Sequence, residues 1–316
     1  MQTLQDLRII FMGTPEFAVV SLQRLLEARA RVEAVVTVPD RPAGRGRKLA
    51  ASAVKNFATS IGLPVYQPEN FQEPSFLRVL QQHRAEIFVV VAFRILPRSV
   101  FSLPKLGTVN AHGSLLPKYR GAAPIQWAVI NGERETGITT FLIDDKVDTG
   151  NLLLQRVTPI DANETAGELH DRLAVLGAEL LIETLNGLAQ GTLTPQPQQG
   201  EPTRAPKITK EMARIDWQRP AKQLHNFIRG MSPVPAAFAL WQNKKLRIFR
   251  SSLQAASHAA SPAGTVLQMD RRNGRFEIAT GDGTLAILEL QLEGKKRMPV
   301  TEFLQGSELR VGERLR

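Results

Sequence analysis

Residues 8–26 read RIIFMGTPEFAVVSLQRLL, an apolar strand pattern followed directly by a helical one. The run Arg8–Met12 has no polar alternation after its first residue, as in a strand that is covered on both faces. Thr14 is a candidate helix cap, and Pro15 suits the first helical position. Apolar residues then fall at i, i+4, i+7 and i+8 on one helix face, namely Ala18, Leu22, Leu25 and Leu26. This stretch predicts the first strand–helix unit of an α/β fold.

The same alternation of strand and helix patterns continues to about residue 189. Further strands are predicted at Val32–Val38, Glu86–Ala92, Thr108–Ala111, Ile138–Ile143 and Leu152–Val157. Thr165 and Glu168 have the spacing of a capping box and open a helix with a leucine stripe. Strands without polar alternation, separated by amphipathic helices, predict a mostly parallel sheet covered on both faces. We therefore expect residues 1–189 to form a Rossmann-like domain.

A change of composition separates this part from the rest of the chain. Residues 190–206 are rich in proline and glutamine and have no apolar periodicity, which predicts an extended linker. Residues 207–316 begin with one helical pattern around Ala221–Ile228. Short strands follow, separated by turn residues, at Leu246–Phe249, Thr265–Met269, Arg275–Ala279 and Leu285–Leu290. This pattern predicts a small β-barrel, OB-like or SH3-like.

The composition of the 316-residue chain excludes several classes of protein. At 43% hydrophobic and 22% charged residues the chain can bury a core in each domain. It has no cysteine, which excludes disulfides, thiolate metal sites and a cysteine nucleophile and fits a reducing compartment. The longest apolar run, Ile87–Phe93, is far shorter than the roughly 20 residues of a membrane helix. The first ten residues do not resemble a signal or transit peptide. We expect a cytoplasmic protein.

The net charge of +10 is unevenly distributed. Residues 201–316 carry +9 of it, whereas residues 1–200 carry only +1. A basic domain attached to a nearly neutral one suggests a polyanionic partner, most often nucleic acid. A second basic segment, Pro39–Lys48, follows the second predicted strand and holds Arg41, Arg45, Arg47 and Lys48. Gly44 and Gly46 predict a mobile loop at the carboxyl end of a strand, and its arginines suit phosphates or unpaired bases.

Motifs of the common nucleotide-binding and hydrolytic folds are missing. The first strand–helix turn, Gly13–Glu16, is not the G-x-G-x-x-G fingerprint, so a nicotinamide dehydrogenase is disfavoured. The chain also has no G-x-S-x-G elbow and no Walker loop, which argues against a serine hydrolase and a P-loop protein.

The clearest chemical signal lies where the fourth predicted strand ends. Asn110 and His112 are two residues apart, so their side chains point to the same side of an extended backbone. An amide and an imidazole together can bind a carbonyl oxygen and move a proton. A carboxylate partner is available in IDDKVDTG, residues 143–150, where Asp148 precedes a sharp turn. The aspartates there do not have calcium-loop spacing, so we expect no metal.

Several of these segments together resemble the 10-formyltetrahydrofolate-dependent formyltransferase family over nearly the whole chain. The central match is NAHGSLLPKYRGAAPIQWAVINGERETGIT at residues 110–139, followed by DTG at 148–150. FMGTPEFA at 11–18, PDRPAGRGRKL at 39–49, the APKI, KE and RIDW groups within 205–217 and GKKRMPVTEFLQG at 294–306 are also similar to the family.

The resemblance implies specific roles for residues of this sequence. It implies catalysis by Asn110, His112 and Asp148 and a folate site that includes Ser114, Leu115, Leu116 and Pro117. It implies formyl transfer from 10-formyltetrahydrofolate, as co-substrate, to the α-amine of methionine on the initiator tRNA, by a monomer. We expect the basic loop Pro39–Lys48 to close over the acceptor end of the tRNA and to position the aminoacyl amine. Expected tRNA contacts are Arg41, Arg45, Arg47, Lys48, Lys207 and Lys210.

Two other functions are compatible with parts of the sequence. The first is formyl transfer to a small amine, such as glycinamide ribonucleotide or an amino sugar, which would leave the +9 C-terminal part unexplained. The second is a non-catalytic RNA-binding protein, against which the complete set of Asn110, His112 and Asp148 argues.

Overall fold

The computed structural model of the chain describes residues 3–43, 48–254 and 261–316. The described residues form two compact units, and each unit is assembled from more than one segment of the chain. The first unit lies within Met1–Gly121, Gly137–Thr158 and His170–Arg204, and the second within Ala122–Thr136, Pro159–Leu169 and Ala205–Arg316. Among the described residues, no helix combines the length and the apolar character that a membrane crossing requires.

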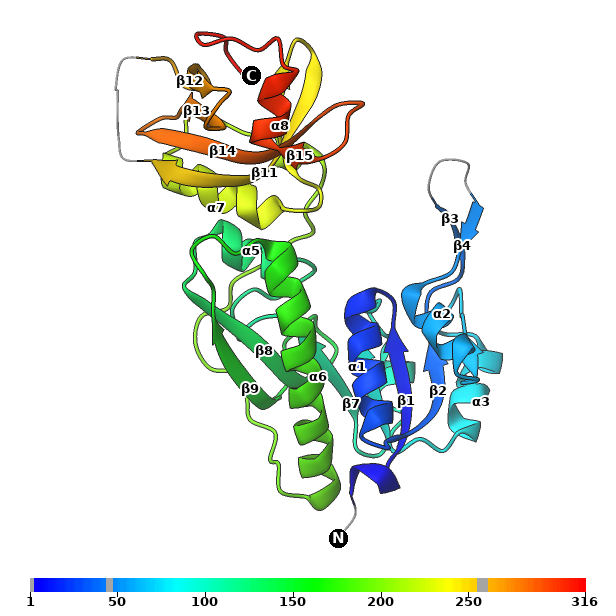
Figure 1. The fold of residues 1–316 in the computed structure, drawn as a ribbon. Coiled ribbons are helices and arrows are strands. Elements are labelled where there is room, and N and C mark those ends of the chain that lie inside the picture. Colours follow the sequence, from blue (N-terminus) through cyan, green and yellow to red (C-terminus); the bar gives the residue numbers. More distant parts are fainter. Residues whose placement is uncertain (1–2, 44–47, 255–260) are drawn as a thin grey trace. The chain divides into compact units, whose positions relative to one another are not determined.

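The first unit is built on a seven-stranded sheet with the strand order β5-β2-β1-β6-β7-β8-β9 (Figure 1). The pairs from β5 to β7 are parallel, and β8 runs antiparallel to β7. The strands are β1 (Arg8–Gly13), β2 (Arg31–Val36), β5 (Val65–Tyr66), β6 (Ile87–Val91), β7 (Thr108–His112), β8 (Glu135–Leu142) and β9 (Leu152–Pro159). The expected mostly parallel, Rossmann-like domain is confirmed.

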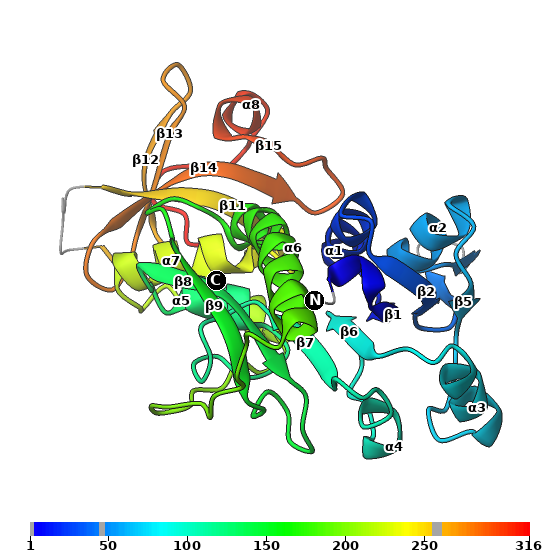
Figure 2. The ribbon, with the colours of Figure 1, turned by 90° about the horizontal axis from the view of Figure 1, so that it is seen from below.

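Helices cover both faces of this sheet, which explains why its central strands are apolar without alternation. Figure 2 shows α1 (Glu16–Glu27), α2 (Ala53–Ser60) and α6 (Ala166–Gln190) on one side and α3 (Pro74–Gln82) and α4 (Arg98–Phe101) on the other. Alternate residues of β1 and β6 pack against α3 and α4 in one cluster that includes Ile10, Met12, Phe88, Val90, Phe76, Leu80 and Val100. A short 3₁₀ helix, Leu4–Asp6, precedes β1.

The sequence predicts how two helices begin, and only one of these two predictions is confirmed. Helix α1 begins at Glu16 with Pro15 in the capping position, so the expectation that Thr14 caps it is wrong. Pro15 is therefore the cap and not the first helical residue, and its carbonyl accepts hydrogen bonds from Ala18 N at 3.0 Å and Val19 N at 3.4 Å. The capping box of α6 is confirmed: Thr165 Oγ1 accepts a hydrogen bond from Glu168 N at 3.3 Å, and Glu168 Oε2 accepts one from Thr165 N at 2.9 Å.

The described residues of the basic segment after β2 form two paired strands, which we call the hairpin, whereas residues 44–47, where a loop is expected, lie outside the described residues. Strand β3 (Arg41–Ala43) pairs antiparallel with β4 (Lys48–Ala50). The base of the hairpin is fixed, because Asp40 accepts hydrogen bonds from Lys55 Nζ at 2.6 Å and from Gln67 Nε2 at 2.8 Å. The hydrogen bond from Lys55, then that from Gln67, lowers the pKa of the Asp40 carboxyl. Figure 1 shows the hairpin beyond the end of the sheet toward which β1 points.

The second unit contains an antiparallel sheet with the order β10-β11-β14-β13-β12, to which β15 adds on β14. Its elements are α5 (Pro124–Ile130), a 3₁₀ turn (Glu211–Ala213), α7 (Ala221–Met231), β10 (Ala237–Trp241), β11 (Lys244–Gln254), β12 (Val266–Asp270), β13 (Arg275–Ala279), β14 (Thr284–Leu292), β15 (Met298–Pro299) and α8 (Val300–Gln305). The helix and four strands expected here are present, and β10, β15 and α8 are additional.

The end of the chain connects the two outer strands of this sheet. Arg316 exchanges backbone hydrogen bonds with Leu240 of β10, and Val266 of β12 donates to the carbonyl of Glu313. The sheet is thereby closed over an apolar core to which α7 contributes Leu224 and Ile228. The sequence predicts a small barrel here but not that the chain end closes it, because the last six residues have no strand periodicity.

Candidate active site

Strand β7 carries two candidate catalytic residues at its carboxyl end. Asn110 lies beside Val90 of β6 and opposite Phe141 of β8, and His112 lies opposite Thr139. The residues are two positions apart on one strand, so both side chains emerge on the same face. Strands β1, β6 and β7 are parallel neighbours, and their carboxyl ends meet at this edge, where α/β sheets place their ligand sites.

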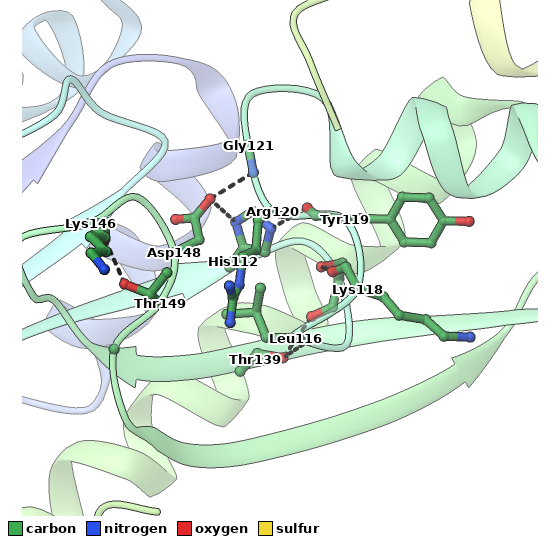
Figure 3. A network of polar contacts seen from close by, with 12 residues as sticks. His112, Leu116, Lys118, Tyr119, Arg120, Gly121, Thr139, Lys146, Asp148 and Thr149 are labelled. Carbon is green, nitrogen blue, oxygen red and sulfur yellow. Dashed lines mark hydrogen bonds and ion pairs between the residues drawn. The ribbon is translucent and has the colours of Figure 1, made fainter. Parts of the chain in front are cut away.

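The imidazole of His112 is held between two groups, as Figure 3 shows. Its Nε2 lies 2.9 Å from the carbonyl oxygen of Tyr119, and its Nδ1 lies 3.8 Å from Oδ2 of Asp148. A carbonyl oxygen can only accept a hydrogen bond, so Nε2 carries the proton in this arrangement. Nδ1 is therefore the nitrogen that can gain or lose a proton, and the Asp148 carboxylate would balance the charge of the doubly protonated ring. The residue is buried, with 7% of its surface exposed.

Asp148 is fixed by its backbone as well as by its side chain. Its φ of +55° is in the left-handed region, which non-glycine residues rarely adopt. Its Oδ2 accepts a hydrogen bond from the backbone N–H of Gly121 at 2.8 Å. Gly150 completes the turn, and a Cβ there would lie 1.7 Å from the carbonyl oxygen of Leu142. Glycine is therefore required at position 150, because the turn passes directly beside the end of β8.

The other two aspartates of this loop have structural roles. Asp144 Oδ1 accepts hydrogen bonds from Lys146 N at 3.0 Å and from Thr149 Oγ1 at 2.7 Å, which shapes the turn. Asp145 pairs with the Arg98 guanidinium, whose hydrogen bonds lower the pKa of that carboxyl. Only Asp148 of the three is directed at His112. In the described ranges, no group of three or more His, Cys, Asp and Glu residues could hold a metal ion.

The segment Ser114–Pro117 forms a rigid loop directly after β7. Ser114 is fully buried, and its hydroxyl donates a hydrogen bond to the Lys118 carbonyl at 2.7 Å. Thr139 Oγ1 donates to the Ser114 carbonyl at 2.6 Å and accepts from Leu116 N at 3.1 Å. Leu116 is also buried, whereas Leu115 and Pro117 are half-buried. Of the four residues expected at a folate site, Leu115 and Pro117 thus have surface for a ligand, and Ser114 and Leu116 hold the loop.

The side chain of Asn110 is available for a ligand. It is half-buried, and no hydrogen bond engages it among the residues that the structure describes. A free amide N–H on the same strand face as His112 can donate a hydrogen bond to a carbonyl oxygen on which negative charge develops.

The expected tRNA-binding residues lie in both units. Arg41 is exposed in β3, and Lys48 begins β4, whereas Arg45 and Arg47 lie outside the described residues. Burial, and then the charge of Arg41, lowers the pKa of Arg94, so Arg41 adds positive potential to that part of the first unit. Lys207 and Lys210 are exposed in the second unit.

Three groups at the site were missed by sequence reasoning. They are the carbonyl of Tyr119, the N–H of Gly121 and the side chain of Gln198, which contacts the Asp148 loop. A backbone carbonyl or N–H is not marked by any particular residue type, so the sequence does not reveal its role. Gln198 is one of several glutamines in a segment whose composition predicts a linker. The match of KYRG to a family motif was the only pointer to the first two.

Comparisons with known proteins cover most of the chain. The family model described as formyl transferase matches residues 7–185, and the model of the formyl transferase C-terminal domain matches residues 207–308. The chain is 50% identical to the methionyl-tRNA formyltransferase of Pelobacter propionicus, over 96% of this chain and 94% of that protein. It is 44% identical to the methionyl-tRNA formyltransferase of Bacteroides thetaiotaomicron, over 98% of both chains.

Solved structures share the fold at low sequence identity. Methionyl-tRNA formyltransferase from Clostridium thermocellum has a TM-score of 0.55 at 17% identity, covering 78% of this chain and 94% of that chain. HypX from Aquifex aeolicus, in complex with tetrahydrofolic acid, has a TM-score of 0.65 at 17% identity, and the match covers 97% of this chain but 50% of HypX. An N-formyltransferase from Helicobacter canadensis, in complex with folinic acid and dTDP-3-aminofucose, has a TM-score of 0.63 at 21% identity, covering 92% of this chain and all of that one.

Proposed function

The chain belongs to the formyl transferase family, and on this premise we propose that it transfers the formyl group of 10-formyltetrahydrofolate to the α-amine of methionyl-tRNA. The product would be the N-formylmethionyl-tRNA used to initiate translation. The observation that carries the proposal is the identity of 44–50% to methionyl-tRNA formyltransferases over nearly the full length of both chains. The paired His112 and Asp148 beside Asn110 supply chemistry that suits this reaction.

The three polar residues would have separate roles. Asn110 would donate its amide N–H to the formyl oxygen as the attacking amine converts that carbon to a tetrahedral centre. His112 would accept the proton that the amine loses, at Nδ1, and the Asp148 carboxylate would stabilise the resulting cation. The bond between the formyl carbon and the folate nitrogen then breaks, and His112 returns its proton to that nitrogen, so no covalent formyl–enzyme is required. Transfer of this kind needs no nucleophilic side chain, which agrees with a chain that has no cysteine.

Donor and acceptor would be held by different parts of the site. The folate contacts are proposed to come from Leu115 and Pro117, while Ser114 and Leu116 keep their loop in place. The tRNA contacts are proposed to come from Arg41, Arg45, Arg47 and Lys48 of the basic segment after β2, and from Lys207 and Lys210. The charge of +9 in residues 201–316 supports phosphate binding there.

We propose that residues 1–189 form the catalytic domain and residues 207–316 the tRNA-binding domain. Residues 190–206, expected as a linker, join the two, and up to Arg204 they belong to the first compact unit. Within that division, the segments 122–136 and 159–169 pack with the C-terminal unit. A protein that formylates initiator tRNA would act where translation occurs, in the cytoplasm, and we propose that it acts as a monomer. Light scattering at several protein concentrations measures the oligomeric state.

A formyl-transfer assay with four acceptors tests the function. Radiolabelled donor is mixed with methionyl-tRNA, uncharged tRNA, free methionine or a small amine such as glycinamide ribonucleotide. Label should enter methionyl-tRNA only. Label in the small amine with none in methionyl-tRNA would replace the proposed acceptor, and no label in any acceptor would reject the enzyme assignment.

A further inference from the structure

Gln198 joins the two loops that hold His112. Its Nε2 donates to the carbonyl oxygens of Asp148 and Gly150, both at 2.9 Å. Its Oε1 accepts from the Arg120 guanidinium, at 2.6 Å from Nη2 and 3.2 Å from Nε. Gln198 is half-buried, whereas its neighbours Pro197 and Gln199 are exposed. One side chain therefore connects the loop that carries Asp148 with the loop that carries the Tyr119 carbonyl.

The backbone around Gln198 lies along the first unit on both sides of this contact. Gln196 exchanges backbone hydrogen bonds with Leu152 at 2.7 and 2.9 Å. Thr203 accepts from Tyr119 N through its Oγ1 at 2.8 Å and from Arg120 N through its carbonyl at 2.9 Å. We call residues 196–203 the strap. Although composition predicted a linker, the strap is hydrogen-bonded at both ends, which fixes the position of Gln198 between them.

The chemistry of these contacts requires an amide at position 198. Two carbonyl oxygens need a donor, and a guanidinium needs an acceptor, so only one orientation of the amide satisfies both. A carboxylate of the same shape would retain the contact with Arg120 but would place an oxygen against the Asp148 and Gly150 carbonyls. Glutamine is thus the residue that can hold both loops at once.

We propose that Gln198 is a positioning residue for formyl transfer, acting through the backbone of Asp148. The proposal rests on the proposed function of the site. Asp148 has a left-handed φ of +55°, and such a conformation persists where surrounding contacts determine it. Gln198 binds the carbonyl of that residue, and Gly121 N binds its carboxylate. Without the amide, the turn loses a contact that keeps the carboxylate facing His112.

Three variants of the full-length chain test this role. Gln198→Glu keeps the shape and the Arg120 contact but removes the donor, and Gln198→Met removes both contacts. Gln199→Glu is the matched control, because it makes the same charge change at the neighbouring exposed residue. Steady-state kinetics with methionyl-tRNA and 10-formyltetrahydrofolate are combined with amide hydrogen exchange over residues 117–123 and 144–151.

Both Gln198 variants should lower kcat by about tenfold to a hundredfold, with both KM values within about twofold of wild type. Exchange should become faster in both peptides, and Gln199→Glu should match wild type. Added to Asp148→Ala, Gln198→Glu should cost nothing further in kcat, because the two changes remove one function. A raised KM with unchanged kcat would assign the strap to substrate binding and overturn the proposal. Unchanged hydrogen exchange in both variants would also overturn the proposal, and this measurement does not depend on activity. A wild-type chain without formyl-transfer activity would by itself reject only the proposed function.

Discussion

Oδ2 of Asp148 lies 3.8 Å from Nδ1 of His112 and also accepts a hydrogen bond from the backbone of Gly121. The backbone donor fixes the carboxylate, and the Tyr119 carbonyl fixes the opposite side of the ring. His112 is therefore oriented by two loops that both lie outside its own strand. The imidazole cannot turn without losing the hydrogen bond at Nε2, so the nitrogen that exchanges a proton is determined by the fold.

The first prediction separates the charge of Asp148 from its shape. Asp148→Asn keeps an oxygen for Gly121 N but removes the negative charge that would balance a protonated His112. Asp148→Asn, Asp148→Ala and His112→Ala should each lower turnover of methionyl-tRNA at least about a hundredfold. The double variant His112→Ala/Asp148→Ala should be little worse than either single variant, since the residues act as one unit. Circular dichroism melts serve as the control for folding, and near-normal turnover in a folded variant would remove that residue from the mechanism.

The second prediction concerns the free amide of Asn110. Asn110→Ala should lower turnover at least about a hundredfold, because one oxyanion donor is typically worth about 2.7–4 kcal/mol. The melting temperature should change little, because the amide has no partner among the described residues. Asn56→Ala, at an exposed position of α2, is the control and should keep full activity. If Asn110→Ala raises only the KM for the donor, Asn110 binds folate rather than the developing charge.

The third prediction concerns Arg45, in the basic segment after β2. Arg45→Ala should weaken use of methionyl-tRNA and reduce the slope of log(kcat/KM) against log salt by about one phosphate contact. Binding of the folate donor should be unchanged. Arg78→Ala, which removes the same charge from an exposed position on α3, should leave the salt slope as in wild type. A fall in folate affinity for Arg45→Ala would instead assign this segment to the donor site.

The fourth prediction concerns stability below neutral pH. Burial lowers the pKa of the His225 imidazole below its usual 6.5, and its nitrogens contact Ser251 Oγ and the Ala162 carbonyl at 3.1 and 3.0 Å. The unfolded chain binds a proton near pH 6.5 while the folded chain resists it. The contribution of neutral His225 to the free energy of unfolding is therefore fully present above pH 6.5. It is lost as the pH falls toward the lower folded pKa, by at most about 1.4 kcal/mol per pH unit.

Urea unfolding between about pH 7.5 and 5 measures this effect. His225→Gln should be less stable than wild type at the upper end of the range and should lose less stability toward the lower end. His170→Gln, at a half-buried histidine with 42% of its side chain exposed, should follow the wild-type curve. Parallel curves for wild type and His225→Gln would show that protonation of His225 does not contribute.

The sequence predicted those features of the fold that depend only on residues within one helix or strand. The apolar runs around β1, β6 and β7 and the capping box at Thr165 depend on neighbours within one or two turns, and the structure has them at the expected places. Asn110 and His112 could be placed on one face because a strand alternates its side chains. The charge of the C-terminal part is likewise a property of composition.

The remaining features depend on contacts between segments far apart in the chain, so only the tertiary structure decided them. The Gly121–Asp148 and Gln198–Asp148 hydrogen bonds join residues 27 and 50 positions apart, and the chain end joins β10 to β12. Residue type and periodicity do not predict such pairs, since a backbone N–H is present at every non-proline position. A proline-rich segment can be a free linker or a hydrogen-bonded strap with the same composition. Which of the two it becomes depends on the unpaired donors and acceptors that the folded sheet presents beside it.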